Sequence, residues 1–385
     1  FNKSNISRHP DAEAWAELAA FVAVGLLLIV LARWTYVGIA WFGLSVGGGI
    51  YFSYWIFQTE LMLIDGFIPA AFLLLVGLKR YTLKFVDEFL QKNAIKKQFA
   101  GYASPTVVKL LQENPDLIKK GTKKEVSIVF SDLRGFTPLG ESFGDDVGGL
   151  TKIMNGYMDA ITEPVLDADG MIIKYIGDAS MHIHNAPIDD ANHARTAVQC
   201  GLDMLSAVEK FNEEVIIPQG RPAVGMGAGI NTGLGYLGEM GSTKRHSYDV
   251  LGDAVSTAAR VESKCKEYGC LLLIGENTYN ATKDDFFYLK VDDLQVKGKS
   301  VGLSIYTVLD QTYPAWKKAQ KKHEQMHEDY RAQRFDDAID KCRMLYTHFD
   351  HKMEKYYDMW IERCEYMKTQ DLPSDWDGIF VATSK

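Results

Sequence analysis

The sequence is poor in cysteine and has no excess of positive charge. Its 385 residues include five cysteines, and none of them forms a CxxC pair or has the spacing of a metal site, so neither a disulfide framework nor a structural zinc is expected. The formal net charge of −8 gives no basic surface for a nucleic-acid partner. We therefore expect reduced cytoplasmic thiols and no nucleic-acid binding.

Long apolar runs are confined to the first part of the chain. They cover residues 16–32, 36–57 and 61–78. Each run is close to the roughly 20 residues that cross a bilayer, and their number excludes a signal peptide. The alternative, three buried helices of a soluble core, would leave no polar face for water. We expect an extracytoplasmic stub over 1–15 and three transmembrane helices over 16–78.

Positive charges predict the orientation of these helices. Arg33 lies between the first two runs, and six Lys and Arg residues follow the third run between 79 and 97. Because cytoplasmic flanks carry the excess of positive charge, everything after residue 78 should be cytoplasmic in a multi-pass protein of the cell membrane, in contact with lipid. The chain begins at Phe1, and an odd number of spans would place any missing upstream sensor domain outside.

A charged connector over 79–122 follows the apolar runs. It is expected to be helical up to Ser104-Pro105. Phe85, Phe89 and Ile95 recur at roughly helical spacing, which is typical of a dimerising helix and equally of a solvated linker.

Strand and helix patterns alternate over residues 123–309. Strands are expected at 125–131, 171–177, 179–185, 223–233 and 235–240, and helices near 145–167, 189–213 and 253–267, with further short strands to 309. The order predicts an α+β fold of ferredoxin-like βαββαβ type, with helices on an antiparallel sheet. The tail over 310–385 is charged and helical, with one repeat-like hairpin pattern but no array.

Two acidic residues lie where strands of this region are expected to end. Asp132 stands in "VFSDLRGFT" and Asp178 in "KYIGDAS". A βαβ unit brings such strand ends together, and two neighbouring carboxylates repel unless a divalent cation lies between them. Oxygen ligands favour Mg²⁺ or Mn²⁺. The loop with Gly135 allows backbone N–H groups to approach an anion such as triphosphate.

Four motifs extend this pattern into a family resemblance. "FSDLRGFT", "IKYIGDA", "YDVLGDAVSTAARVE" and "VKGKSVGLSIY" occur in this order. Together they resemble the catalytic domain of class III adenylate and guanylate cyclases over residues 123–309. The three apolar runs, with the tail ending "LPSDWDGIF", resemble membrane-anchored bacterial-type cyclases that carry a CHASE-type extracellular sensor.

The resemblance implies a two-metal conversion of ATP into 3′,5′-cyclic AMP and pyrophosphate. Asp132, Asp178 and the backbone of Leu133 would hold two Mg²⁺ or Mn²⁺ ions. Gly135, Phe136 and Thr137 would bind the phosphates. The family forms its active sites between the two chains of a homodimer, each chain giving a different half.

The resemblance implies that Lys174, Asp249 and Arg260 form the second half. Lys174 and Asp249 would recognise adenine as donor and acceptor, whereas guanine-specific relatives have Glu and Cys types. Arg260 would stabilise charge on the α-phosphate, and Lys297, with Lys299 as competitor, would bind the terminal phosphates. Ser256 stands where the family has an Asn that orients the ribose, which puts the turnover rate in question.

Two local patterns and two rival functions remain. "GLGYLG" at 233–238 fits GxGxxG, but no helix follows, so we interpret it as a β-hairpin turn. His182 and His184 share a strand face without a third ligand and are interpreted as structural.

A guanylate cyclase is disfavoured by Lys174 and Asp249. A nucleotide-binding module of low turnover is favoured only by Ser256.

Overall fold

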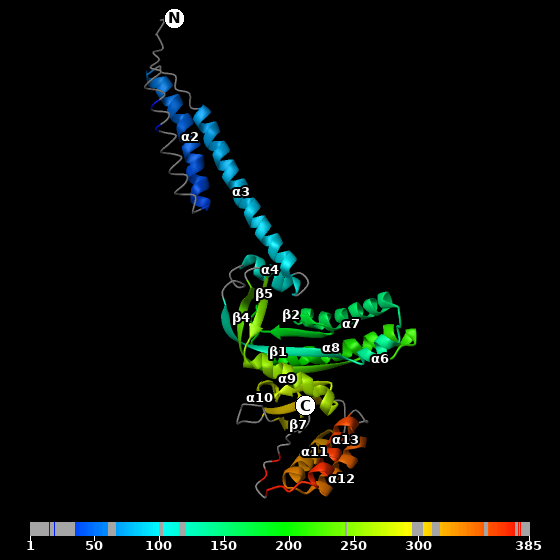
Figure 1. The fold of residues 1–385 in the computed structure, drawn as a ribbon. Coiled ribbons are helices and arrows are strands. Elements are labelled where there is room, and N and C mark those ends of the chain that lie inside the picture. Colours follow the sequence, from blue (N-terminus) through cyan, green and yellow to red (C-terminus); the bar gives the residue numbers. More distant parts are fainter. Residues whose placement is uncertain are drawn as a thin grey trace. The chain divides into compact units, whose positions relative to one another are not determined.

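The computed structural model describes most of the chain (Figure 1). The described residues are Trp15, Ala19, 35–60, 67–99, 103–114, 121–242, 245–294, 303–309, 316–349, 353–373, 376 and 378. They fall into two compact units, residues 1–94 and 95–385. The two units are treated separately below.

The first unit is helical where it is described. Helix α2 (Thr35–Glu60) coincides with the second apolar run. Helix α3 (Phe67–Phe99) continues without interruption from the third run into the charged connector. Apart from Ala19, the run at 16–32 lies outside the described residues. Over the described part of the chain, no helix combines the length and apolarity needed to span a membrane.

Helix α4 (Pro105–Glu113) was not expected from the sequence. Helix α3 ends at Phe99, before Ser104-Pro105 as expected, and Ser104-Pro105 begins this further helix. The Ser104 hydroxyl accepts a hydrogen bond from the Val107 N–H at 3.3 Å, and Pro105 takes the first helical position, where its missing N–H has no cost. Val107 and Leu111 are buried, so α4 is part of the core of the second unit.

One sheet organises the second unit. Its strands are β1 (Thr122–Arg134), β2 (Met171–Ile176), β3 (Ala179–His184), β4 (Gly225–Ser242), β5 (Arg245–Leu251), β6 (Leu272–Gly275), β7 (Phe287–Leu294) and β8 (Leu303–Leu309). The spatial order is β2-β3-β1-β4-β6-β8-β7, and β5 pairs with β4. All pairs are antiparallel except β4 with β6. The β4-β1-β3-β2 order is that of a ferredoxin-like unit, so the α+β prediction is confirmed.

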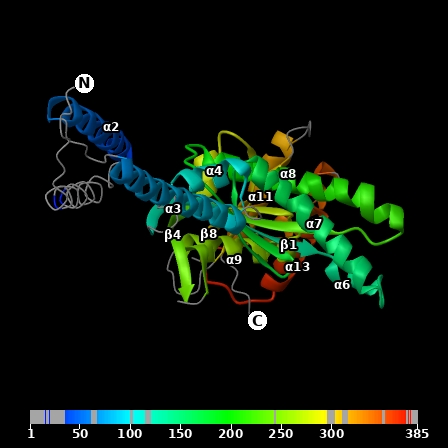
Figure 2. The same ribbon diagram turned by 90° about the horizontal axis from the view of Figure 1, so that it is seen from above.

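Helices cover both faces of this sheet (Figures 1 and 2). They are α6 (Phe136–Glu141), α7 (Val147–Asp167), α8 (His193–Phe211), α9 (Asp253–Tyr268) and α10 (Glu276–Thr282), and a π turn (Asn212–Ile216) and a 3₁₀ turn (Ile217–Gln219) follow α8. Because strand side chains alternate, Val129 of β1 packs in the core formed with α7 and α8. Ile128 packs in the opposite core with α4 and α9.

Helix α9 approaches β4 more closely than a side chain would permit. A Cβ atom placed on Gly229 would lie 2.2 Å from the backbone nitrogen of Glu262. Only glycine fits at this contact. The position of α9, which carries several of the candidate site residues, therefore depends on a residue of β4 that has no side chain.

Two strand boundaries differ from the expectations. Strand β1 does not end at residue 131 but continues to Arg134, because its whole length pairs with β4. Strand β4 is one continuous strand over 225–242, where two were expected. "GLGYLG" therefore lies inside β4 and is not a hairpin turn. Its residues 233–237 pair with β1, and pairing with β5 begins at Tyr236, which leaves no place for a chain reversal.

The tail forms three helices that pack against α9 and β7. They are α11 (Trp316–Arg331), α12 (Phe335–Leu345) and α13 (Glu354–Met367), with a 3₁₀ turn (Tyr346–Phe349) between the last two. The core that these helices share with α9 and β7 contains a buried ion pair. Arg363 Nη1 donates to Asp292 Oδ2 at 2.5 Å, and the Tyr268 hydroxyl donates to the same oxygen. This network connects α13, β7 and α9.

Candidate functional site

Asp132 lies at the point where β1 loses one of its two neighbours. Pairing of β1 with β3 ends at Ser131 opposite Ser180, whereas pairing with β4 continues through Asp132 to Arg134. The Asp132 side chain belongs to the same alternating face as Ile128, which is the face covered by α9. The missing partner strand leaves space beside this carboxylate.

Asp178 occupies the turn that adjoins this space. Gly177, with a φ of 67°, lets the chain reverse between β2 and β3, and Asp178 follows it. Burial raises the pKa of Asp132 above its ordinary value, and the negative charge of Asp178 raises it further. Arg134 and the Leu133 backbone act in the opposite direction. The two predicted metal ligands are therefore electrostatic neighbours.

The donor set of this acidic pair fits a hard divalent cation. Two neighbouring carboxylates in a partly buried position repel each other, and a divalent cation between them stabilises both charges. The nearby donors are oxygen atoms, which Mg²⁺ and Mn²⁺ prefer. Asp132, Asp178 and the Leu133 carbonyl are the groups that would hold such an ion.

A cavity of about 660 Å³ opens beside the acidic pair. Its lining consists of Asp132, Leu133, Arg134, Gly135, Phe136, Thr137, Pro138, Asp178, Cys265, Lys266, Gly269, Cys270, Leu271 and Lys355. The volume falls within the range of ordinary small-molecule sites. Gly135, Phe136 and Thr137, which the resemblance assigns to phosphate binding, all contribute to the wall.

The predicted glycine loop is short and turns directly into helix α6. Gly135 adopts a left-handed conformation with a φ of 85°, which glycine tolerates without strain. No side chain caps the first turn of α6. The chain thus leaves β1 and presents the start of a helix at the cavity within one residue.

Several residues of this region were missed by the sequence interpretation. Lys266, in the last turn of α9, lowers the pKa of Asp132 through its positive charge and lines the cavity. Arg134 donates to Glu262 at 2.8 Å and joins the end of β1 to α9. A signal was available for Lys266, because it lies on the same predicted helix as Arg260.

The structure brings Lys174 and Asp249 together. Lys174 in β2 donates to Asp249 Oδ2 of β5 at 2.6 Å, and Asp249 Oδ1 accepts from the Val250 N–H at 2.8 Å. The Lys174 side chain is 42% exposed and that of Asp249 is 17% exposed. These residues form one donor and acceptor pair at the surface.

Ser256 and Arg260 lie one turn apart on α9. Ser256 is exposed and Arg260 is half-buried. Among the described residues that line the cavity, Lys174, Asp249, Ser256 and Arg260 are absent. One chain therefore presents two separate groups of candidate residues, the acidic pair with its cavity and the group formed by β2, β5 and α9.

Some candidates lie outside the described residues. They are Lys297 and Lys299, in the segment 295–302. Their assignment to the terminal phosphates remains a prediction from the family resemblance.

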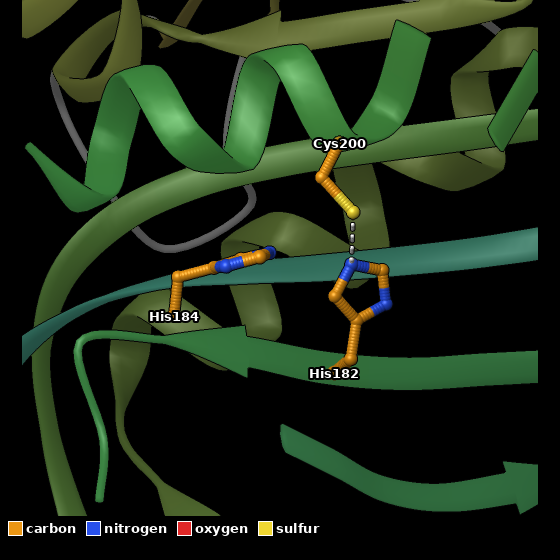
Figure 3. A group of neighbouring side chains, drawn as sticks. All are labelled: His182, His184 and Cys200. Atoms are coloured by element: carbon orange, nitrogen blue, oxygen red, sulfur yellow. Dashed lines mark hydrogen bonds between the residues drawn. The ribbon is translucent and has the colours of Figure 1, made fainter. Parts of the chain in front are cut away.

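A third candidate ligand accompanies the two histidines of β3 (Figure 3). Cys200 of α8 points toward His182 and His184, and the donor atoms of the three buried residues lie within 4.8 Å of one another. However, His182 Nδ1 is buried without a hydrogen-bond partner, whereas a ligating histidine normally donates its other ring N–H to an acceptor. Burial raises the pKa of Cys200 to about 12. We therefore retain the structural interpretation, with neutral side chains.

The fold and the paired carboxylates define a ferredoxin-like α+β domain with an acidic site at the edge of a cavity. Residues 118–310 match the family of the "Adenylate and Guanylate cyclase catalytic domain". The chain belongs to this family, and its catalytic region is a class III cyclase domain.

Curated relatives are similar over this same region. An adenylate cyclase of Anabaena cylindrica is 32% identical over 231 residues, which cover 58% of this chain and 43% of that protein. An adenylate cyclase of Dictyostelium discoideum, terminal-differentiation specific, is 36% identical over 192 residues, covering 49% of this chain and 9% of that protein. The chain thus spans less than half the length of these relatives.

Two solved structures are similar to about half of this chain. The adenylyl cyclase CyaB from P. aeruginosa is 30% identical, with a TM-score of 0.46, covering 50% of this chain and 97% of that chain. The guanylyl cyclase Cya2 is 29% identical, with a TM-score of 0.44, covering 50% and 97%.

The buried histidines predict a loss of stability in acid. The pKa of His184 is lowered from 6.5 to about 4, mainly by burial and also by the charge of His193, with Asp190 acting in the opposite direction. Between these pH values the unfolded chain binds the proton more readily, so His184 removes stability as the pH falls from 6.5 to 4, by about 3 kcal/mol in total. Urea unfolding of the wild type and of His184→Leu, measured at pH 7 and pH 4.5, tests this.

The His184→Leu variant should lose less stability on acidification than the wild type. Cys200→Ala is the matched control, because it removes a neighbour in the same cluster that does not titrate in this range. An equal pH dependence of the wild type and His184→Leu would contradict the assignment.

Proposed function

We propose that this protein is an adenylate cyclase, which converts ATP into 3′,5′-cyclic AMP and pyrophosphate. The observation that carries the proposal is the juxtaposition of Asp132 and Asp178 at a cavity large enough for a nucleotide. Membership of the cyclase family supports the same reaction. The residues Lys174 and Asp249, which lie in contact, favour adenine over guanine, because the lysine can donate to the adenine ring nitrogen and the aspartate can accept from its amino group, whereas guanine has a donor and an acceptor in the reverse places.

Each group of residues would have a separate role in the reaction. Asp132, Asp178 and the Leu133 carbonyl would hold two Mg²⁺ or Mn²⁺ ions, which, when bound, activate the attacking 3′-hydroxyl and neutralise the leaving group. Gly135, Phe136 and Thr137 would orient the phosphates. Arg260 would stabilise the charge that develops on the α-phosphate, and Lys297 would bind the terminal phosphates.

A homodimer would bring the two groups of residues together. The acidic pair of one chain would face Lys174, Asp249 and Arg260 of its partner. In support, large apolar side chains are exposed near Lys174 and Asp249, on β2, β4 and β5. They are Tyr175, Ile176, Leu234, Tyr236 and Leu251. A cluster of exposed apolar residues is typical of a protein interface.

Attachment to the cell membrane is a separate proposal. Helix α2 carries exposed large apolar residues between Leu44 and Phe57. They are Leu44, Ile50, Tyr51, Phe52, Tyr54, Trp55 and Phe57. Apolar side chains on several sides of one helix favour burial in lipid or in other helices. The apolar runs within 16–78 would then anchor a cytoplasmic catalytic domain and transmit a signal to it.

A low-turnover nucleotide-binding module is the second candidate. Ser256 favours it, because its exposed hydroxyl replaces the longer amide that the family uses at the ribose. Product formation discriminates the two candidates. A module of this kind would bind ATP with Mn²⁺ and release no cyclic nucleotide above the level of an acidic-pair variant.

The first functional prediction concerns the reaction itself. The purified chain with Mn²⁺ and ATP should form cyclic AMP, identified by chromatography and mass spectrometry, and should use GTP less well. Asp132→Asn and Asp178→Asn should each reduce turnover about a thousandfold while the domain stays folded, because an amide cannot replace the anionic ligand. Retained turnover in either variant would show that the acidic pair does not hold the catalytic metal.

The second prediction concerns base selection. The double variant Lys174→Glu with Asp249→Cys should lose about tenfold or more in kcat/KM for ATP and gain measurable use of GTP, because donor and acceptor are exchanged. Steady-state kinetics with both nucleotides provides the measurement. An unchanged preference for ATP would mean that this pair does not recognise the base.

The third prediction concerns the shared site. Asp132→Asn and Arg260→Ala chains, each inactive alone, should regain about a quarter of wild-type activity when mixed, because half of randomly paired dimers are mixed and each contains one intact site. The mixture must be shown to contain heterodimers. Heterodimers without activity would contradict the shared site.

A further inference from the structure

Helix α13 contributes a residue to the wall of the nucleotide cavity. Lys355 lines the same cavity as Asp132 and Asp178, although it lies outside residues 118–310, which match the cyclase family. No sequence motif singles it out. Figure 1 shows α13 in the orange-red helical tail, and contacts between α13 and α9 connect the tail to the catalytic region.

The stem of Lys355 is held against the end of α9. A Cβ atom on Gly269 would lie 2.8 Å from Lys355 Cβ and 2.9 Å from its Cγ, so the absence of a side chain at Gly269 makes room for the lysine. Gly269 also ends α9 with a φ of 65°, a conformation that favours glycine. Lys355 is thereby directed along the edge of the cavity.

The helix that carries Lys355 is firmly anchored. The next two residues, Tyr356 and Tyr357, are fully buried. The Tyr356 hydroxyl donates to the Val291 carbonyl at 2.8 Å, and the Tyr357 hydroxyl lies 3.0 Å from His323 Nδ1. The first turn of α13 is therefore positioned by β7 and α11, and Lys355 does not depend on a mobile terminus.

The charges around the cavity suit a polyphosphate. Lys355 is exposed and has no ion-pair partner among the described residues, so its ammonium group is available to a ligand. Lys266, on the neighbouring turn of α9, lines the same wall. In a site with two lysines beside two carboxylates, the metal of a metal-bound polyphosphate would pair with the carboxylates and its phosphates would pair with the lysines.

We propose that Lys355 binds the outer phosphates of the nucleotide and the departing pyrophosphate, so that the helical tail contributes a phosphate-binding residue to the cavity of its own chain. This inference rests on the proposed function, because it assigns a further substrate-binding residue to the same site. It also makes nucleotide affinity dependent on the docking of a segment beyond the catalytic domain.

The test compares phosphate affinity in matched variants of the full chain. Lys355→Ala should weaken the binding of inorganic pyrophosphate with Mn²⁺ about five- to twentyfold by calorimetry, and Lys355→Arg should largely restore it, because one charge-assisted contact is lost and regained. Adenosine, which has no phosphate, should bind equally well to both. The KM for ATP should rise by the same factor, with a smaller change in kcat.

Lys318→Ala is the matched control, because it removes an exposed lysine of the tail that does not line the cavity. Equal pyrophosphate affinity in wild type, Lys318→Ala and Lys355→Ala would overturn the inference, whatever the turnover. If the wild type forms no cyclic nucleotide but Lys355→Ala still loses pyrophosphate affinity, the proposed function fails and the inference stands.

Discussion

The unequal pairing of β1 determines where this protein can carry out chemistry. One edge of the strand stays paired with β4 to Arg134, while the other loses β3 after Ser131. Asp132 lies in this short part of β1, where the backbone is paired with β4 on one side and the other side is open. Asp178 lies in the turn between β2 and β3, directly before the first residue of β3. The repulsion between the two acids follows from the strand lengths, Arg134 and Lys266 offset part of it, and a bound divalent cation would relieve it further.

The order of elements and the acidic pair were predictable from sequence, because apolar alternation and strand-end acids are local signals. The ends of the strands were not predictable, because the lengths of β1 and β4 depend on their pairing with each other, and the two segments are far apart in the sequence. The family resemblance supplied Lys174 and Asp249, and their contact could not be derived from spacing alone. Lys355 had no local signal at all. Its place depends on Gly269 and on the buried tyrosines that follow it.

The contact between Lys174 and Asp249 has modest energetic weight. Ion pairs that are partly exposed contribute about 0–1 kcal/mol, and Lys174 is 42% exposed. A base that offers an acceptor to the lysine and a donor to the aspartate can therefore replace this pair at little cost. Mutual pairing also holds both side chains near the position in which a ligand would use them, which reduces the rotamer entropy lost on binding.

The ion pair between Asp292 and Arg363 bears on what counts as a domain in this protein. Asp292 belongs to the sheet and Arg363 to the tail, and both are buried. Breaking a buried pair by removing one partner costs about 3–5 kcal/mol, because the other charge is left without compensation. That is a large share of the stability of an ordinary domain. The match to the cyclase family ends at residue 310, whereas the compact unit that contains the sheet also includes α13.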